Sequence, residues 1–359
     1  MDRCSTHQDR KVLTINPLVF LSIELTKGKT VKTPLNLKKN LIWATFATTL
    51  ISGISAPIYA DSYPTKPIQL IVAFGAGGST DTMARIFAKY AEEELGQRVV
   101  VVNRPGAGGE LGWVHLANAE PDGYTLGLIN SPVIEVYPFT RESTIGYSLE
   151  DIRPLANIVT DPGVLAVAAD SPYQNLDDFI AAVEQAPESV VVSHEGIGGD
   201  DHLAALNFAK EAGIDLNFVS YNSNAEATAA LLGGHITAFE GNMSEAANQI
   251  QEGKVRGLAV WSEERVAPIA DVPTGKEQGY NVLAAASRGF AVPADIPQSV
   301  YDTLLTATRN VVENPEFLAE MEQLNMPVNP IYGEEYNDFI NESYSRLKAI
   351  WEQSPWIEQ

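Results

Sequence analysis

The chain has 359 residues, a net charge of −22 and a single cysteine, Cys4. Because one hydrophobic core rarely serves more than roughly 250–300 residues, this length suits two domains. The acidity excludes the clustered Lys and Arg of a nucleic-acid or anionic-lipid surface, and one cysteine excludes a disulfide framework or a thiolate metal site.

The first 60 residues differ from the rest in charge. They hold eight basic and three acidic groups, so the remaining 299 residues carry a net charge of −27. Lys38 and Lys39 precede a mainly apolar stretch over residues 41–54, and small residues lead to Ala60. This order predicts a secretory signal peptide that is cleaved after Ala60. The stretch is shorter than the 18 or more residues of a membrane-spanning helix, and the alternatives are a buried N-terminal helix or an uncleaved anchor.

The leader, residues 1–60, is unusually long for a signal peptide. A second apolar patch over residues 17–23 lies in front of the predicted one. We therefore expect translation to start near Val31 and residues 1–30 to reflect a wrongly assigned start. The mature chain would then contain no cysteine, which is compatible with an oxidising compartment.

Strand-like apolar runs alternate with helical patterns after residue 62. A buried strand is predicted over residues 68–74, and a helix begins at Ser79 and ends at Gly96. Further strands are predicted over residues 99–102, 124–129, 164–168, 190–193, 217–221, 236–239 and 257–261. Helices are predicted between these strands, except between residues 129 and 164, and beyond Pro297 over residues 299–313, 315–324 and 334–351. This alternation indicates an α/β protein with an open, mostly parallel sheet.

Two glycine-rich loops, over residues 74–81 and 193–202, each connect a strand to a helix. Ligands of open α/β sheets bind at the carboxyl ends of strands, and glycine N–H groups at a helix N-terminus suit an anion. The dinucleotide fingerprint is absent, because Thr80 and Leu111 stand where its third glycine would be, and no P-loop occurs. The alternative is that these glycines only form turns.

Catalytic patterns are missing from the mature sequence. Its four histidines show no metal-ligating spacing, and no Gly-x-Ser-x-Gly nucleophile motif occurs. The pair Asp200 and Asp201 is more typical of a helix start than of an acid/base pair. We therefore expect no catalytic residue, no metal and no cofactor. His202 is the partial exception, since it falls in the first turn after the second loop, near a bound ligand.

Several motifs occur in the order of a known family. They are Tyr-Pro-Thr-Lys-Pro-Ile at 63–68, Gly-Gly-Ser-Thr-Asp at 77–81, Asn-Arg-Pro-Gly-Ala-Gly-Gly at 103–109, Pro-Asp-Gly-Tyr-Thr-Leu at 121–126, Gly-Gly-His at 233–235, Gly-Lys-Val-Arg-Gly-Leu-Ala-Val at 253–260 and Asp-Val-Pro-Thr at 271–274. Over residues 62–352 the chain resembles the Bug, or tripartite tricarboxylate transporter, receptor family.

The resemblance implies a periplasmic solute receptor with a two-lobed Venus fly-trap fold, each lobe a mostly parallel sheet flanked by helices. Lobe one would comprise residues 61–160 and 285–359, and lobe two residues 161–284. The receptor, a monomer, would deliver a di- or tricarboxylate to a transporter with one large and one small integral membrane subunit. The alternative is an α/β enzyme that acts on a small carboxylate with Asp81 or His202 as base.

The resemblance also implies which residues bind the ligand, largely through backbone N–H groups and water. The expected binding residues are Phe74, Gly75, Gly77, Gly78, Ser79, Thr80, Asp81, Ser131, Gly196, Gly198, Gly199, Asp200, His202, Asn242 and Arg288. Ser287-Arg288 stands where many members have an aromatic pair, and the sequences around Asp200 and Asn242 look like the tricarboxylate-type branch. Arg288 is expected at the hinge or in the cleft, with a surface position or a structural salt bridge as alternatives.

Overall fold

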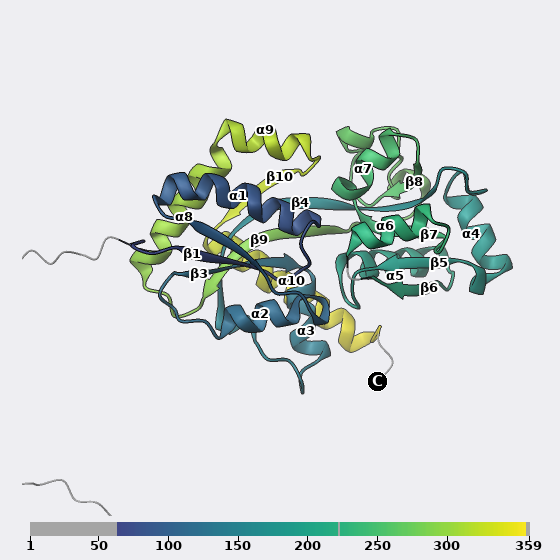
Figure 1. Cartoon of the computed structure of the whole chain (residues 1–359). Helices are drawn as coiled ribbons and strands as arrows, with labels where there is room; N and C mark the ends of the chain where they lie inside the picture. The colour runs from purple at the N-terminus through teal and green to yellow at the C-terminus, as the bar shows by residue number, and fades with distance from the viewer. Residues whose placement is uncertain (1–62, 222, 357–359) are drawn as a thin grey trace, which may run out of the picture. The chain divides into compact units, whose positions relative to one another are not determined.

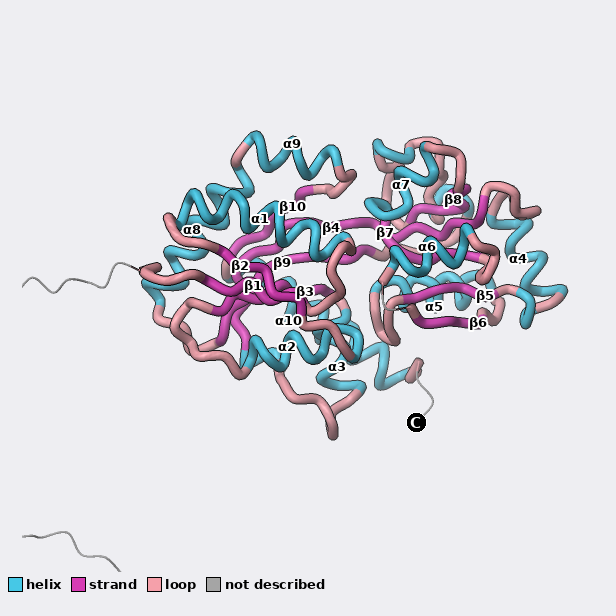
Figure 2. Tube along the Cα trace, in the orientation of Figure 1, coloured by secondary structure: helices cyan, strands magenta, loops and turns pink. Residues whose placement is uncertain are grey.

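The computed structural model describes residues 63–221 and 223–356, so the predicted signal peptide, its cleavage point and the alternative start lie outside the described residues. In this part of the chain ten strands form one continuous sheet in the order β2-β1-β3-β9-β4-β7-β5-β6, with β10 and β8 also paired to β4 (Figure 2). The strands are β1 (Ile68–Val72), β2 (Val99–Asn103), β3 (Thr125–Ser131), β4 (Ile152–Ala168), β5 (Val191–His194), β6 (Asn217–Ser220), β7 (Ala238–Asn242), β8 (Val255–Val260), β9 (Ala285–Pro293) and β10 (Val328–Tyr332).

Strands β1–β3, β9 and β10 form what we call the first half of the sheet, which has helices on both faces (Figure 1). These helices are α1 (Ser79–Leu95), α2 (Glu110–Ala117), α3 (Val133–Thr140), α8 (Gln298–Glu313), α9 (Pro315–Gln323) and α10 (Glu334–Gln353). Side chains such as Phe87 and Leu304 form one core with Leu70, and side chains such as Trp113 and Tyr336 form another with Ile129. A strand covered on both faces needs a nearly continuous apolar run, which β1 has.

Strands β5–β8 form the second half of the sheet, which is layered in the same way. Its helices are α4 (Leu176–Gln185), α5 (Asp200–Ala212), α6 (Asn224–Leu232) and α7 (Met243–Gln251). Phe179 and Phe208 pack on one face of this half, and Leu231 and Met243 pack on the other. The predicted helix cap at Asn175 is present, because its side chain accepts a hydrogen bond from the Asp178 N–H.

The predicted α/β class is confirmed, and the structure adds the direction of each strand pair. Parallel pairing joins β1 to β2 and β3, and β5 to β6 and β7, whereas the pairs that involve β4 or β9 are antiparallel. Strand β4 is 17 residues long and pairs within both halves, but the sequence predicted only its end at residues 164–168. The rest of β4 was not predicted because it contains Pro154 and Pro162, and proline disfavours a central strand. The boundaries of the two predicted lobes stay a prediction.

The length and hydrophobicity of a helix decide whether it can cross a membrane. Across residues 63–221 and 223–356, every helix falls short of the combined length and hydrophobicity that a membrane crossing requires.

Candidate functional site

The first predicted loop meets the second half of the sheet at the carboxyl ends of the strands. Ser79 begins α1 after the first loop, and its hydroxyl donates to Glu245 Oε1 over 2.7 Å. Glu245 lies in the first turn of α7, after β7. The contact therefore joins the first half of the sheet to the second, where the fold places helix N-termini.

The first loop is held in shape by Asp81. Its carboxylate accepts hydrogen bonds from the Gly77 N–H over 2.9 Å, from Arg85 Nε over 2.9 Å and from Asn103 Nδ2 over 2.8 Å. Burial opposes the charge, but the hydrogen bonds from Arg85, Gly77 and Asn103 outweigh it and lower the pKa of Asp81. Gly77 has a φ of +88°, a conformation that glycine adopts without strain. Asp81 thus acts within the first half and stabilises the loop backbone.

Replacing Asp81 with Asn is expected to lower the free energy of unfolding by about 2 kcal/mol at neutral pH, because charged hydrogen bonds are lost. Since the folded pKa is lowered, this contribution is present above the unfolded pKa near 3.8 and disappears as pH falls through the folded value. Urea unfolding at pH 7 and at pH 3 measures both effects. Asp177→Asn, at an exposed first-turn position of α4, is the control, and an equal loss in both variants would contradict the assignment.

The second loop is held by Asp201. Its Oδ2 accepts from the Glu195 N–H over 2.5 Å, and its Oδ1 accepts from the His202 N–H over 2.7 Å. Gly198 N–H donates to His202 Nδ1 over 3.2 Å. Burial, helped by His194, lowers the pKa of His202 to about 4, so the imidazole is neutral and serves as an acceptor.

The second loop lies directly against α3 of the first half. A Cβ placed on Gly198 would be 2.5 Å from Val136 Cγ1, and one placed on Gly196 would be 3.4 Å from the Tyr137 hydroxyl. Gly198 also has a φ of +85°. Glycine is therefore required at position 198, both by its backbone conformation and by the close approach of α3.

Arg288 forms a buried ion pair at the crossing between the halves. Its Nη1 donates to Asp161 Oδ2 over 2.7 Å, and its Nη2 donates to Asn242 Oδ1 over 2.7 Å. The Asn242 side chain in turn donates to Asp200 Oδ2 over 2.7 Å. The sequence allowed a cleft position, a surface position or a structural salt bridge for Arg288. The structure shows a buried salt bridge, and Arg288 lies on strand β9 beside the site.

The structure brings several predicted residues into one hydrogen-bond network and leaves others outside that network. Ser79, Asp200, Asn242 and Arg288 are connected through Glu245 and Asp161. Elsewhere, Phe74 packs against Trp113, Thr80 accepts from Asn130, His202 packs against Phe218, and Ser131 is buried at the end of β3. The sequence did not predict four residues of this region as part of the site: Asp161, Glu195, Asn224 and Glu245. The pattern Asn242-x-x-Glu245 is a capping box and could have indicated the last of these.

Four carboxyl groups crowd the second half of the site: Glu195, Asp200, Asp201 and Glu245, which we call the acidic cluster. Burial raises the pKa of each of them. Neighbouring carboxylates add to this rise for Glu195 and Asp201, whereas Arg288 opposes it for Asp200 and Glu245. Glu195, Asp200 and Glu245 are half-buried residues, whereas Asp201 is buried.

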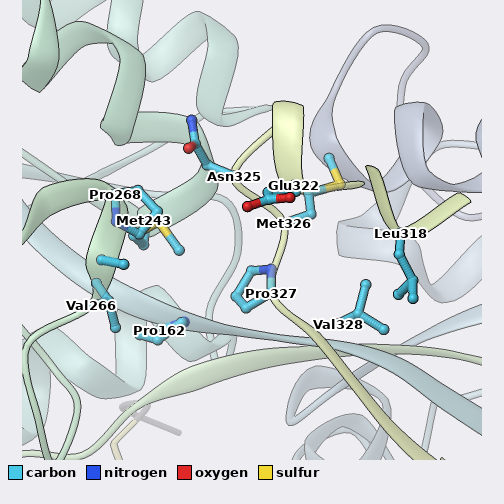
Figure 3. Close-up of a pocket in the computed structure, with 11 residues that line it drawn as sticks. Pro162, Met243, Val266, Pro268, Leu318, Glu322, Asn325, Met326, Pro327 and Val328 are labelled. Atoms are coloured by element: carbon cyan, nitrogen blue, oxygen red, sulfur yellow. The ribbon is translucent and has the colours of Figure 1, made fainter. Parts of the chain in front are cut away.

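Two pockets border this region without including Gly75 to Asp81. The larger, of 720 Å³, lies between α5 and α10, and Ser131, Asp200 and Ser287 are among its lining residues. The other, of 440 Å³, is shown in Figure 3. Its lining is mostly apolar, with side chains such as Met243, Leu318 and Met326, and Glu322 is its charged residue. That lining does not suit a carboxylate.

Known proteins are similar to this chain in sequence and fold. The profile of the family described as tripartite tricarboxylate transporter family receptor matches residues 83–355. This chain belongs to that family. Protein BugT of Bordetella pertussis is 38% identical to this receptor over 244 residues, which are 68% of this chain and 74% of BugT.

Two solved structures extend the comparison to the fold. The periplasmic binding protein BugD is 28% identical, with a TM-score of 0.76 over 83% of this chain and 100% of BugD. MatC from Rhodopseudomonas palustris, solved with bound malate, is 24% identical, with a TM-score of 0.73 over 80% of this chain and 99% of MatC. The receptor therefore has the two-lobed fold of periplasmic binding proteins, and the predicted family and fold are confirmed.

Proposed function

We propose that this receptor works in the periplasm, captures a small carboxylate between its two glycine-rich loops and delivers it to a membrane transporter of one large and one small subunit. The observation that carries the proposal is the start of α1 and of α5. Gly78 and Gly199 are their N-cap residues, and neither helix has a side-chain cap. The first N–H groups of α1 are thus free of the usual capping side chain and face an anion favourably, whereas in α5 the His202 N–H already donates to Asp201.

We also propose that the receptor has no catalytic activity. The two side chains that the enzyme alternative would use as a base are already engaged, Asp81 by Arg85 and Asn103, and His202 by Gly198. Thermal unfolding with malate, adipate and citrate tests the function. A ligand at 100 times its Kd adds about 2.7 kcal/mol of stability and is recovered unchanged. Stabilisation by none of them would contradict a carboxylate receptor, and consumption of the ligand would favour the enzyme.

Gly78→Val separates binding from folding. Gly78 has a φ of −75°, and the nearest atom to a Cβ there is Gly75 O at 3.9 Å, so the fold accommodates a side chain. The added isopropyl group would block a ligand from the N–H groups of the loop. We expect affinity for the best carboxylate to fall at least about tenfold, or 1.4 kcal/mol, while the unfolding midpoint falls only by the modest cost of valine at a helix N-cap. If titration calorimetry gave Gly78→Val the wild-type affinity, the first loop would not be part of the binding site.

A further inference from the structure

A carboxyl group that belongs to the second half of the sheet lies at the start of α1. Glu245 Oε1 accepts the hydrogen bond of the Ser79 hydroxyl over 2.7 Å, and Ser79 is the first residue of α1. Within residues 63–221 and 223–356, this hydroxyl is the one hydrogen-bond partner of Oε1. The end of the helix that favours an anion therefore already faces a carboxyl group of the protein.

The other oxygen of Glu245 is held within the second half. Oε2 accepts hydrogen bonds from Asn224 Nδ2 over 2.6 Å and from the Asn242 N–H over 3.3 Å, and Glu245 forms a capping box with Asn242 at the start of α7. These donors fix one oxygen and leave the other directed at α1. Because the side chain is already ordered, little conformational entropy is lost when Oε1 meets Ser79, which strengthens the contact.

Ser79 cannot serve two carboxylates at once. Its hydroxyl has a single proton to donate, so it binds either Glu245 or a ligand carboxylate. Like charges that face one another are also unfavourable, and Arg288 favours the ionised form of Glu245 against the effect of burial on its pKa. Neither of the two pockets that border this region includes Ser79 or Glu245, so these groups are in contact and not on opposite walls of a cavity.

From these contacts we infer that Glu245 competes with the ligand carboxylate for the start of α1 and thereby limits the affinity of the receptor. Binding separates Oε1 from the Ser79 hydroxyl, and the free energy of that separation lowers the apparent affinity. Glu245 thus sets affinity as the group that the ligand replaces. This inference rests on the proposed carboxylate receptor and names the side chain that opposes its ligand.

Titration calorimetry with malate, adipate and citrate on the purified receptor tests the competition. In Glu245→Ala the competing carboxyl group is gone, and we expect the ligands that bind to do so at least about tenfold more tightly than in the wild type. Glutamine can also complete a capping box, so Glu245→Gln keeps the start of α7. Its amide oxygen still accepts from Ser79, and a smaller rise in affinity is expected.

Two comparisons show whether the rise comes from competition. The factor should be similar for every ligand that binds, because each one displaces the same group. Glu342→Gln, at an exposed position of α10, removes an acidic group far along the sequence and should leave each affinity unchanged. A factor that differed widely among the ligands would mean that Glu245 contacts their variable part, and it would overturn the competition.

Other outcomes separate this inference from the proposed function. Weaker or unchanged binding in both Glu245 variants, at unfolding midpoints close to that of Glu342→Gln, would overturn the inference while the receptor function stands. If Glu245→Ala fails to fold, the direction of the change in Glu245→Gln decides. Binding of none of the three ligands by the wild type or by either variant would overturn the proposed function and the inference with it.

Discussion

Arg288→Met is expected to lower the free energy of unfolding by about 3–5 kcal/mol, because Asp161 would remain buried without its cation. The side chains of this pair are 3% and 0% exposed, and the methionine cannot replace either hydrogen bond of the guanidinium. Asp161 also accepts from the Ser244 N–H, so its carboxyl group is fixed in place and cannot turn toward solvent. Denaturant unfolding at pH 7 measures the loss.

A surface pair provides the control for Arg288. Arg265 pairs with Glu277 over 2.9 Å, but both side chains are more than two-fifths exposed, so Arg265→Met should cost less than about 1 kcal/mol. The double variant Asp161→Asn with Arg288→Met should recover part of the loss, because no uncompensated charge stays buried. A loss in Arg288→Met no larger than in Arg265→Met would show that the buried pair does not support the fold.

Glu135 is expected to make the receptor less stable as pH rises. It lies in α3 with a fully buried side chain, and neither of its oxygens has a well-formed hydrogen bond in the described residues. Burial raises the pKa of Glu135 to about 8, with weaker opposing effects from Ser131 and Arg346. The folded state therefore holds a proton that the unfolded state releases near pH 4.5, so stability is complete below that pH and is lost up to about pH 8.

Glu135→Gln isolates this effect, because an amide cannot ionise. The variant should match the wild type near pH 4.5 and exceed it by a margin that grows by about 1.4 kcal/mol per pH unit, reaching about 3–5 kcal/mol at pH 8. Urea unfolding at pH 5, 6, 7 and 8 measures the margin. In Glu142→Gln, at an exposed position, the free energy of unfolding should change with pH as it does in the wild type. A constant margin between Glu135→Gln and the wild type would exclude a buried titrating group.

The regular elements could be predicted because their patterns are local. The helix at Ser79 ends at Gly96 in a left-handed conformation, as the sequence indicated, and the three helices beyond Pro297 were found. Strands β9 and β10 were not, since β9 combines small residues with a buried arginine and β10 is partly exposed. Their pairing with β4 joins segments more than a hundred residues apart, which periodicity cannot reveal.

The site could be predicted less completely than the fold. Glycine loops between strands and helices are visible in a sequence, so the loops at 74–81 and 193–202 were found. The partner of Arg288 was not, because Asp161 lies in an apolar strand beside a proline and pairs with a residue 127 positions away. The convergence of Glu195, Asn224 and Glu245 likewise depends on three separate strand ends meeting at one edge.

Strand β4 also limits how this sequence can change in length. Leu155 belongs to a core of the first half and Leu165 to a core of the second. The number of residues between them therefore decides whether both side chains point into their cores. Side chains alternate along a strand, and inserting or deleting one residue between them would turn every side chain beyond it to the opposite face. Surface loops in the same protein can absorb such changes. Among relatives, β4 should therefore keep its length while the neighbouring turns gain and lose residues.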